Sequence, residues 1–366
     1  MKKFFKWLND SSYTKPLSPA CKRCSDGSKM VVLITGLCPA NCFYCPLSKE
    51  KLGKDRIFAD EWELKDENDT EKLILEAQYI KATGAGITGG DPLAVWKRTK
   101  KYIQILKDHF GTDFHIHLYT SGIKNSDRIE DIVSAGLDEI RFHPMPKNWK
   151  NMNDIAIKDS VNLDVDVAIE IPAIPDMEDD MFKLITWADQ IGVKWINLNE
   201  LEFSETNAEK LIEKGFTVKD DLSSAVKGSQ ETAYNAIKRA SEQELDVGVH
   251  YCSSSFKDGI QLRNRIMRRA KSIAKEYEII TEDGTILKGI ITSKTSLDQI
   301  KKILVENFKI NDKQIFINRT KNRIELPINV LEKIVIDLKK QGCECFIVEE
   351  YPTADQLEVE RIVLPQ

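Results

Sequence analysis

Apolar and polar positions alternate with two different periods between residues 30 and 252. Short runs rich in Val, Ile and Leu show the two-residue alternation of β-strands, and the segments between them repeat apolar positions with helical spacing. The expected strands span residues 30–36, 85–88, 114–120, 138–143, 164–171, 194–200 and 246–251. The expected helices include residues 70–82, 98–110, 127–135, 180–190 and 230–244. Strands and helices that alternate in this way predict an α/β fold with a parallel sheet, closed into a full or partial barrel.

The pattern changes after residue 275. The Asp283-Gly284 pair between two β-rich runs predicts a hairpin, and a helix over 296–308 and further strands follow it. We therefore expect a small C-terminal α+β domain. The expected organisation is an N-terminal extension over 1–29, a βα barrel over 30–275 and the small domain over 276–366.

A polar segment, 204–228, interrupts the barrel pattern after the sixth expected strand. Loops that follow the strands of a βα barrel lie at the carboxyl ends of those strands, where active sites are built. We expect this segment on the rim of the barrel, as a substrate lid.

Three cysteines follow the first expected strand within one short loop. Cys38, Cys42 and Cys45 are separated by three and then two residues. Structural zinc sites normally close four protein ligands, whereas an iron–sulfur cluster accepts thiolates and can leave one iron open to another molecule. The odd number of thiols favours the cluster. The alternative is a zinc ribbon made by Cys21 and Cys24 with two of the later cysteines, which leaves one thiol unused.

The loop resembles the C-x3-C-x-aromatic-C signature of the radical S-adenosylmethionine superfamily. Over residues 20 to 270 the chain is similar to archaeal members related to pyruvate formate-lyase activating enzymes. The motifs that carry the resemblance are Thr-Gly-Leu-Cys38, Phe-Tyr-Cys45-Pro, Thr-Gly-Gly-Asp91-Pro and His115-Ile-His117-Leu-Tyr-Thr. The resemblance implies a partial (β/α)6-type barrel and a 4Fe-4S cluster held by Cys38, Cys42 and Cys45. It also implies that S-adenosylmethionine is cleaved reductively to a 5'-deoxyadenosyl radical.

The resemblance also implies cofactor contacts. Tyr44 matches the position that touches adenine. Gly89, Gly90 and Asp91 match the motif that holds the methionine amino group, because glycines let the backbone approach a ligand and an acid accepts hydrogen bonds from an ammonium. Taken alone, these residues also fit a tight turn. Ser121 lies in a small polar segment that resembles the part of activating enzymes that meets the ribose and methionine.

Strand alternation predicts a polar barrel interior. The inward sets of four successive strands are His115, His117 and Tyr119; Glu139, Arg141 and His143; Asp164, Asp166 and Glu170; and Asn197 and Asn199. A purely structural centre would be filled by Val, Ile and Leu, so we expect a cofactor and substrate cavity; a mutually satisfied polar network is the alternative. We expect Glu170 and Asn199 to contact the ribose or methionine carboxylate. We expect His117, Arg141 and His143 to orient substrate.

Four further potential ligands flank the barrel. Cys21 and Cys24 precede the first strand, and His250 and Cys252 end the last one. They predict an auxiliary iron–sulfur cluster or a Cys3His zinc site, provided that residues 24–30 fold back.

Composition limits the partners. A net charge of -5 argues against a surface built throughout for nucleic acid, although the basic helical run 260–275 fits either a solvated face or a phosphate-binding one. The apolar run in residues 1–8 is too short for a signal peptide or a membrane span. We therefore expect a cytoplasmic protein without a membrane partner.

Three classes of function fit these observations. The first is a radical enzyme that modifies RNA or protein, and the second is a radical enzyme that acts on a small molecule. Both need a low-potential electron donor such as ferredoxin or flavodoxin. The third is a non-catalytic iron–sulfur or zinc protein for binding or electron transfer. Cleavage of S-adenosylmethionine after reduction separates the third class from the others.

Overall fold

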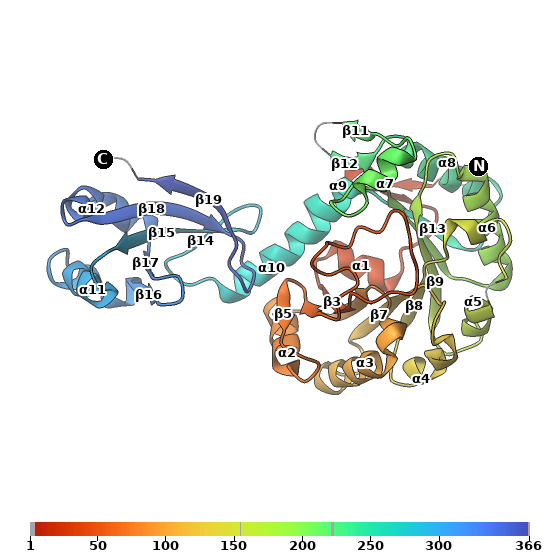
Figure 1. The fold of residues 1–366 in the computed structure, drawn as a ribbon, viewed down its shortest axis with the longest axis horizontal. Coiled ribbons are helices and arrows are strands. Elements are labelled where there is room, and N and C mark those ends of the chain that lie inside the picture. Colours follow the sequence, from red (N-terminus) through yellow and green to blue (C-terminus); the bar gives the residue numbers. More distant parts are fainter. Residues whose placement is uncertain (1–3, 154, 221–222, 365–366) are drawn as a thin grey trace. The chain divides into compact units, whose positions relative to one another are not determined.

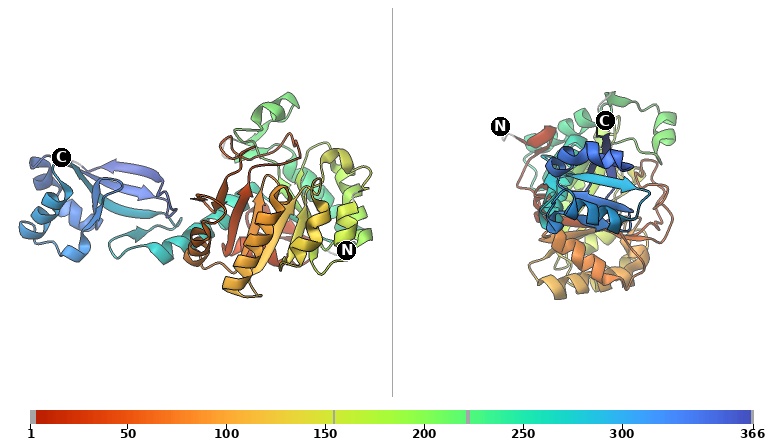
Figure 2. Two further views of the ribbon diagram at one scale, coloured as in Figure 1. Left: turned by 60° about the horizontal axis from the view of Figure 1, so that its bottom comes forward. Right: turned by 90° about the vertical axis from the view of Figure 1, so that its left-hand side faces the viewer.

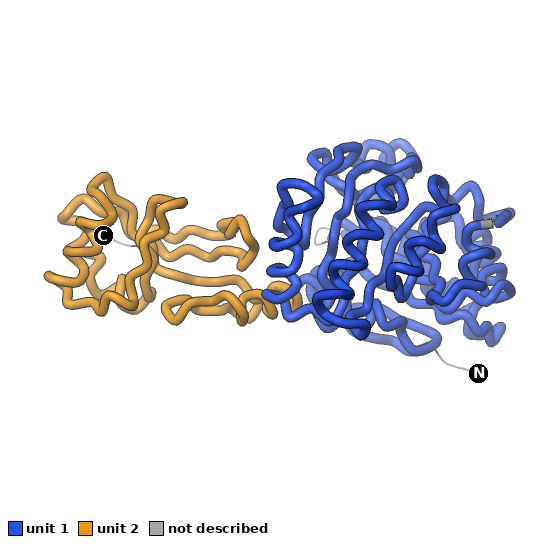
Figure 3. Tube along the Cα trace, turned by 90° about the horizontal axis from the view of Figure 1, so that it is seen from below, with its two compact units in different colours: residues 1–262 blue, residues 263–366 orange. Residues whose placement is uncertain are grey.

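The computed structural model describes residues 4–153, 155–220 and 223–364. The chain divides into two compact units, Met1–Leu262 and Arg263–Gln366 (Figure 3). Helix α10 (Arg263–Ile273), which the sequence pattern assigns to the barrel domain, belongs to the second unit. The first residues of the expected N-terminal extension and the last residues of the expected small domain lie outside the described residues.

A curved parallel sheet forms the frame of the first unit (Figure 1). Its parallel strands are β3 (Lys29–Thr35), β6 (Gly84–Gly89), β7 (His115–Thr120), β8 (Glu139–Phe142), β9 (Asp166–Ala173), β10 (Trp195–Glu200) and β13 (Gly248–Cys252). They pair in the order β13-β10-β9-β8-β7-β6-β3, and each of these pairings is parallel. All seven expected strands are present, with their ends shifted by at most two residues. The expected α/β fold with a partial barrel is confirmed.

Helices cover the outer face of this sheet (Figure 1). They are α2 (Thr70–Tyr79), α3 (Trp96–Phe110), α4 (Ile129–Val133), α5 (Ile155–Ser160), α6 (Glu178–Ile191) and α8 (Ser229–Glu242). The outward strand residues Ile116, Leu118 and Ile140 are fully buried in one apolar cluster with helix residues such as Tyr102 and Leu106. Burying a side chain of this size contributes about 1.5–3 kcal/mol, so the outward set fixes the strand register against the helices.

Antiparallel strands cover both edges of the parallel sheet. The β13 edge pairs with β2 (Ser12–Tyr13), which pairs with β1 (Phe5–Lys6). The β3 edge pairs with β4 (Ile57–Ala59), which pairs with β5 (Trp62–Leu64). Helix α1 (Pro19–Ser25) lies inside the curve of the sheet (Figure 1). The described sheet therefore ends in two very short strands, β1 and β5, which offer little edge for another chain to pair with.

The polar segment after β10 contains helix α7 (Ala208–Glu213) and a hairpin of β11 (Val218–Asp220) and β12 (Ser223–Val226). It lies at the carboxyl end of the parallel strands beside the loop that follows β3 (Figure 2, left). Its expected place on the rim is confirmed. The short helix α9 (Ser254–Phe256) follows β13 at the same end.

The second unit is an antiparallel sheet with two helices on one face. Its strands are β14 (Ile279–Ile280), β15 (Ile286–Ser293), β16 (Phe316–Asn318), β17 (Arg323–Leu326), β18 (Cys343–Glu350) and β19 (Glu358–Val363). Helices α11 (Leu297–Glu306) and α12 (Ile328–Lys340) share an apolar cluster with the sheet. The expected turn at Gly284 is present, with the positive φ of 87° that favours glycine. The expected α+β character is confirmed. None of the described helices has the length and hydropathy needed to cross a bilayer.

Candidate active site inside the barrel

Arg141 is the centre of a buried polar network. Its Nε donates to Glu139 Oε1 at 2.6 Å, and its Nη1 donates to Glu170 Oε2 at 2.6 Å. Its Nη2 donates to Ser18 Oγ at 2.9 Å and to Cys21 Sγ at 3.2 Å. Burial opposes the charge, but Cys21, Glu139 and Glu170 together raise the pKa of Arg141 well above its usual value. Protein partners therefore engage all three guanidinium nitrogens, and one of them holds Glu170; the expected role of Arg141 in orienting substrate stays a prediction.

Glu170 and Asn199, which the sequence pattern pairs, do lie together. Asn199 Nδ2 donates to Glu170 Oε1 at 2.9 Å, and Asn197 Nδ2 donates to Oε2 at 3.0 Å. Burial alone would raise the pKa of Glu170, but the charge of Arg141 and the hydrogen bond from Asn199 lower it below the usual value. The barrel thus presents an ionised carboxylate at neutral pH. Such a carboxylate accepts hydrogen bonds from hydroxyl groups.

His143 connects this network to the cysteine loop. The Tyr44 hydroxyl and His143 Nε2 are 2.9 Å apart, and the two rings are 5.6 Å apart at a tilt. Burial lowers the pKa of His143, so the ring is neutral at pH 7. A neutral ring has one donor and one acceptor nitrogen and fixes the direction of the Tyr44 side chain.

Cys38, Cys42 and Cys45 are free thiols at the mouth of the barrel. Cys38 is exposed, and the other two are partly buried. Burial, followed by the charges of Asp91, Cys42 and Cys45, raises the pKa of Cys38 to about 11. In the described ranges, no three His, Cys, Asp or Glu side chains are grouped to hold a single metal ion. A cluster makes a different demand, because each thiolate bonds a separate iron; three soft, accessible donors in one loop fit such a cluster.

Gly89 and Gly90 bring the next loop against the start of the cysteine loop. Gly89 has a φ of 136°, and a Cβ there would lie 2.1 Å from the Thr35 carbonyl oxygen. A Cβ on Gly90 would lie 2.2 Å from the Leu37 carbonyl oxygen, and the Gly90 amide donates to Thr35 O at 2.7 Å. Both glycines are therefore required for this close backbone packing, whatever ligand the turn holds.

Asp91 uses its carboxylate inside the protein. It is fully buried and accepts hydrogen bonds from Leu93 N at 3.0 Å, Thr120 Oγ1 at 2.8 Å and Ser121 N at 3.1 Å. Ser121 Oγ also donates to it. Asp91 therefore joins the loops after β6 and β7 and places Ser121 beside the Gly-Gly turn, and its expected contact with an ammonium stays a prediction.

Cys21, Cys24 and Cys252 interact electrostatically inside the barrel. Helix α1 carries the first two into the barrel, and burial raises the pKa of Cys252, to which the Cys21 and Cys24 charges add. Neighbouring His250 is 5% exposed, and neither ring nitrogen has a hydrogen-bond partner among the described residues. These side chains are not grouped closely enough in the described ranges to hold a single metal ion.

Two further inward side chains complete the interior. His117 is fully buried, and neither of its ring nitrogens has a hydrogen-bond partner in the described part of the chain. Lys29, 8% exposed, begins β3 and interacts with Cys24. The sequence pattern did not predict Lys29 as a site residue, although Lys29 alternates with Val31 and Leu33 on the inward face of the same strand.

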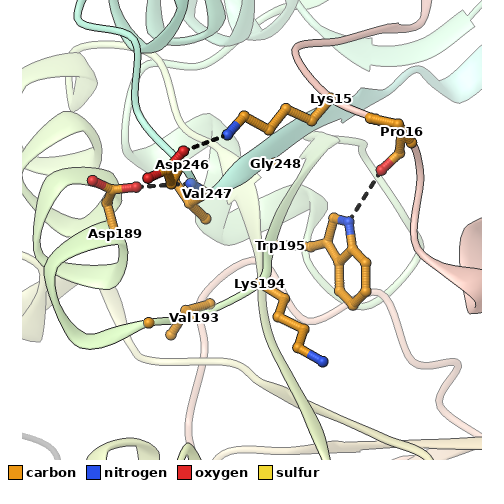
Figure 4. A pocket seen from close by; sticks show the side chains of 10 residues that line it. Lys15, Pro16, Asp189, Val193, Lys194, Trp195, Asp246, Val247 and Gly248 are labelled. Carbon is orange, nitrogen blue, oxygen red and sulfur yellow. Dashed lines mark hydrogen bonds and ion pairs between the residues drawn. The ribbon is translucent and has the colours of Figure 1, made fainter.

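A cavity of about 440 Å³ lies at the other end of the barrel, at the first residues of β10 and β13 (Figure 4). Its polar groups already have partners. Lys15 pairs with Asp246 at 2.9 Å, Asp189 accepts from Val247 N at 2.7 Å, and Trp195 Nε1 donates to Pro16 O at 3.1 Å. The candidate site is therefore the polar interior below the cysteine loop.

Comparisons with known proteins identify the family of this chain. A family model described as "Radical SAM superfamily" matches residues 32–144, and one described as "Domain of unknown function (DUF8061)" matches residues 284–364. A protein of Methanocaldococcus jannaschii named "Putative glycyl-radical enzyme activating enzyme" is 43% identical over 365 residues, which cover 95% of this chain and 93% of that protein.

Two solved structures of Streptococcus suis SuiB are also similar. SuiB bound to the precursor peptide SuiA has 13% identity and a TM-score of 0.48, over 73% of this chain and 61% of that chain. SuiB bound to S-adenosylmethionine has 10% identity and a TM-score of 0.43, over 62% of this chain and 50% of that chain. This chain thus spans between half and two thirds of the SuiB chain.

Proposed function

We propose a function from the premise that the chain belongs to the radical S-adenosylmethionine superfamily. Cys38, Cys42 and Cys45 are proposed to hold the 4Fe-4S cluster of this radical enzyme. The radical is proposed to modify a protein substrate. The observation that carries the proposal is the position of the three-thiol loop over a polar barrel interior, to which Tyr44 and His143 connect it. When bound, the cluster supplies the electron that cleaves S-adenosylmethionine into methionine and a 5'-deoxyadenosyl radical.

The residues of the chain bind and orient the cofactor. We propose that Glu170 accepts hydrogen bonds from the ribose hydroxyl groups and that Asn199 donates a hydrogen bond to the ribose. Arg141 keeps Glu170 ionised. Tyr44 lines the adenine position, and Asp91 holds Ser121 and the Gly89-Gly90 turn near the methionine. The buried His117 has unpaired ring nitrogens and is available to orient substrate. His143, in contact with Tyr44, is a positioning residue.

A protein substrate is supported by two observations. The relative at 43% identity is named as an activating enzyme of glycyl-radical enzymes, which are themselves proteins. Exposed apolar side chains occur on the segments that follow the parallel strands, namely Leu37, Leu52, Ile123 and Val218. Exposed apolar groups around a site favour a macromolecular partner over a small polar substrate. We also propose a low-potential ferredoxin or flavodoxin as reductant.

The small C-terminal domain is proposed to serve docking rather than chemistry, because every candidate site residue lies in the first unit. RNA is the second macromolecular candidate, supported by the basic helix α10. Charge reversal at Arg265 and Arg268 separates the two: it abolishes salt-sensitive RNA binding if RNA is the substrate and leaves modification of a protein unchanged. A cytoplasmic location is proposed because the eight cysteines are free thiols, which fits a reducing compartment.

Cys21, Cys24 and Cys252 are proposed as ligands of a second metal site, an auxiliary cluster or zinc. Support comes from the charges of Cys21 and Cys24, which raise the pKa of Cys252. Further support comes from His250, whose ring nitrogens have no hydrogen-bond partner among the described residues. The thiol of Cys21 accepts a hydrogen bond from Arg141, as a thiolate would require.

Anaerobic reconstitution with iron and sulfide tests both sites. We compare the wild type with the Cys38/Cys42/Cys45→Ala variant and with a Cys21/Cys24→Ser variant, using Cys343→Ala in the second unit as a matched control. Metal per chain and 5'-deoxyadenosine after dithionite reduction are measured. We expect the triple variant to lose about four irons and all 5'-deoxyadenosine.

The outcomes separate the alternatives. About eight irons in the wild type, falling to about four in the Cys21/Cys24 variant, supports an auxiliary cluster, and one zinc lost in that variant supports a zinc site. Zinc alone, without cleavage under reducing conditions, contradicts the proposal and leaves a non-catalytic metal protein.

A further inference from the structure

The polar segment after β10 contacts the cysteine loop at several independent points. We infer that Ser204–Phe216, called the clamp below, is a positioning element that holds the cysteine loop in its ligating shape before any cluster is bound. The inference rests on the proposed function, since it takes the loop to be the cluster's loop.

Asn207 is the main contact. It is 1% exposed and lies just before α7. Its Nδ2 donates to the Tyr44 carbonyl oxygen at 3.1 Å and to the Glu202 carbonyl oxygen at 3.0 Å, and its Oδ1 accepts from Ser204 N at 2.7 Å. One side chain thus joins the cysteine loop to the strand that ends in Glu200. A buried amide with all its groups engaged has little freedom to move away.

Thr206 and Phe216 add contacts on either side. Thr206 Oγ1 donates to the Cys45 carbonyl oxygen at 3.1 Å. The Phe216 and Phe43 rings are stacked, with centroids 6.5 Å apart and an interplanar angle of 7°. The Lys214 ammonium lies 4.7 Å from the centre of the Phe43 ring. The clamp therefore touches three consecutive residues of the loop, Phe43, Tyr44 and Cys45.

The residues on both sides of the clamp are held together. Phe203 N donates to Ser224 O at 2.7 Å, and Val226 N donates to Leu201 O at 2.7 Å. Lys257, after the last parallel strand, forms an ion pair with Glu202. The clamp thus begins and ends at anchored backbone near the strand ends, which favours a supporting role for it.

Such a support has a physical reason. Three thiolates in one loop repel each other, and ordering a loop costs conformational entropy. Contacts with the backbone carbonyls of Tyr44 and Cys45 order the loop without occupying the thiols. The clamp thereby favours cluster binding and slows cluster loss.

The test uses hydrogen–deuterium exchange of the full-length apoprotein, which needs no cluster. Asn207→Asp keeps the shape of the side chain but removes both amide donors, and Thr206→Val removes the hydroxyl that Thr206→Ser retains. Ile212→Ala, an exposed position on α7, is the matched control. Peptides covering residues 38–48 are followed, with tryptophan fluorescence as a check that the barrel stays folded.

We expect Asn207→Asp and Thr206→Val to speed exchange in the loop by roughly tenfold, the usual effect of leaving a buried partner unpaired. Thr206→Ser and Ile212→Ala should match the wild type. In reconstituted protein, the same two variants should lose iron to a chelator faster by a similar factor. If Asn207→Asp unfolds the barrel, the Thr206→Val and Thr206→Ser pair still decides the question.

Two outcomes keep this inference distinct from the proposed function. Unchanged loop exchange and iron loss in a protein that cleaves S-adenosylmethionine would overturn the clamp and leave the enzyme standing. Faster loop exchange in variants of a protein that binds no iron would support the clamp and overturn the cluster.

Discussion

At the scale of single residues, the sequence predicts which side chains face inward but not what each one contacts. Alternation along the strands placed His117, Arg141, His143 and Glu170 on the inner face, and the structure confirms this face. Glu139 lies on the same strand as Arg141, but the other partners of Arg141 come from β9, helix α1 and its N-cap, which are distant in sequence. No local pattern contains that information. Inward direction is therefore predictable from one strand, whereas a residue's role depends on tertiary neighbours.

Replacing Arg141 with Met should strongly destabilise the first unit. The change leaves Glu139 and Glu170 without their cation, and an unpaired buried charge costs about 3–5 kcal/mol. Urea unfolding of the apoprotein, followed by tryptophan fluorescence, measures the loss, because all six tryptophans lie before residue 263. Arg56→Gln, which removes an exposed pair with Glu63, is the control and should leave the midpoint nearly unchanged. A small effect of Arg141→Met would show that the network adds little stability.

The buried histidines predict a stability loss in mild acid. Burial lowers the pKa of four histidines below the usual 6.5, so these rings are neutral in the folded state at neutral pH; they are His115, His117, His143 and His250. Below pH 6.5 the unfolded chain binds protons that the folded chain does not, and each histidine then reduces stability by up to about 1.4 kcal/mol per pH unit. Above pH 6.5 these rings are neutral in both states and do not change the stability, which declines only as the pH falls below that value.

Urea unfolding followed by tryptophan fluorescence at pH 7.5 and pH 5.5 checks this expectation. The free energy of unfolding should drop by up to about 5 kcal/mol between the two values, if all four rings stay neutral in the folded state. His117→Gln should show a smaller drop than the wild type. Glu170 does not contribute to the change between pH 7.5 and pH 5.5, because its pKa lies below the usual carboxylate value. Equal stability at both pH values would contradict neutral burial of these rings.

At the scale of elements, long periodic segments were predictable and short ones were not. The seven parallel strands and the covering helices have enough residues to show their period. The two edge hairpins and helix α1 are only two to seven residues long, and their position depends on the open edges of the sheet. The clamp was predictable as a rim segment, but its contacts with the cysteine loop were not, because they join residues 161 and 163 positions apart.

Ser18 is the residue that attaches helix α1 to the barrel. Its Oγ accepts hydrogen bonds from Cys21 N at 3.1 Å, as the N-cap of the helix, and from Arg141 Nη2 at 2.9 Å. Ser18→Ala should lower the stability of the first unit by about 1–2 kcal/mol, because it removes the cap and leaves a donor of Arg141 unpaired. Urea unfolding by tryptophan fluorescence measures the effect.

A matched cap in the second unit provides the control. Ser296 Oγ caps helix α11 by accepting from Gln299 N at 3.3 Å. Ser296→Ala should leave the tryptophan transition unchanged, since the second unit contains no tryptophan. If Ser18→Ala behaves like this control, helix α1 does not contribute to the stability of the barrel.

At the scale of the whole molecule, the sequence predicts two parts but places their boundary differently. Each unit has its own apolar core, one spread over the parallel sheet and its helices and one between α11, α12 and the antiparallel sheet. The sequence pattern continues as a helix through the point where the units divide, at residues 262 and 263, so periodicity alone gives no sign of it. A boundary that falls inside a helical run is set by which core the helix contacts.

The second unit contains a buried charge network that tests this division. The Lys288 ammonium is 2.7 Å from Glu278 Oε1, 3.1 Å from Glu350 Oε2 and 3.6 Å from Glu325 Oε2, and its side chain is 2% exposed. Burial alone would raise the pKa of Glu325, but Lys288 and its other partners lower it to about 2. The pKa of Glu350 is lowered as well, so Glu325 and Glu350 stay ionised at neutral pH, and Lys288 is the buried cation that they share.

Lys288→Met should destabilise the second unit by about 3–5 kcal/mol, because it leaves buried carboxylates without their central cation. If each core unfolds as its own cooperative unit, circular dichroism will show an early transition in this variant while the tryptophan transition of the first unit keeps its midpoint. Lys302→Met, at an exposed pair with Glu306, is the control and should change neither transition. A parallel shift of both transitions in Lys288→Met would instead mean that the two units fold as one, and the assignment of the barrel's chemistry to the first unit alone would then have to be abandoned.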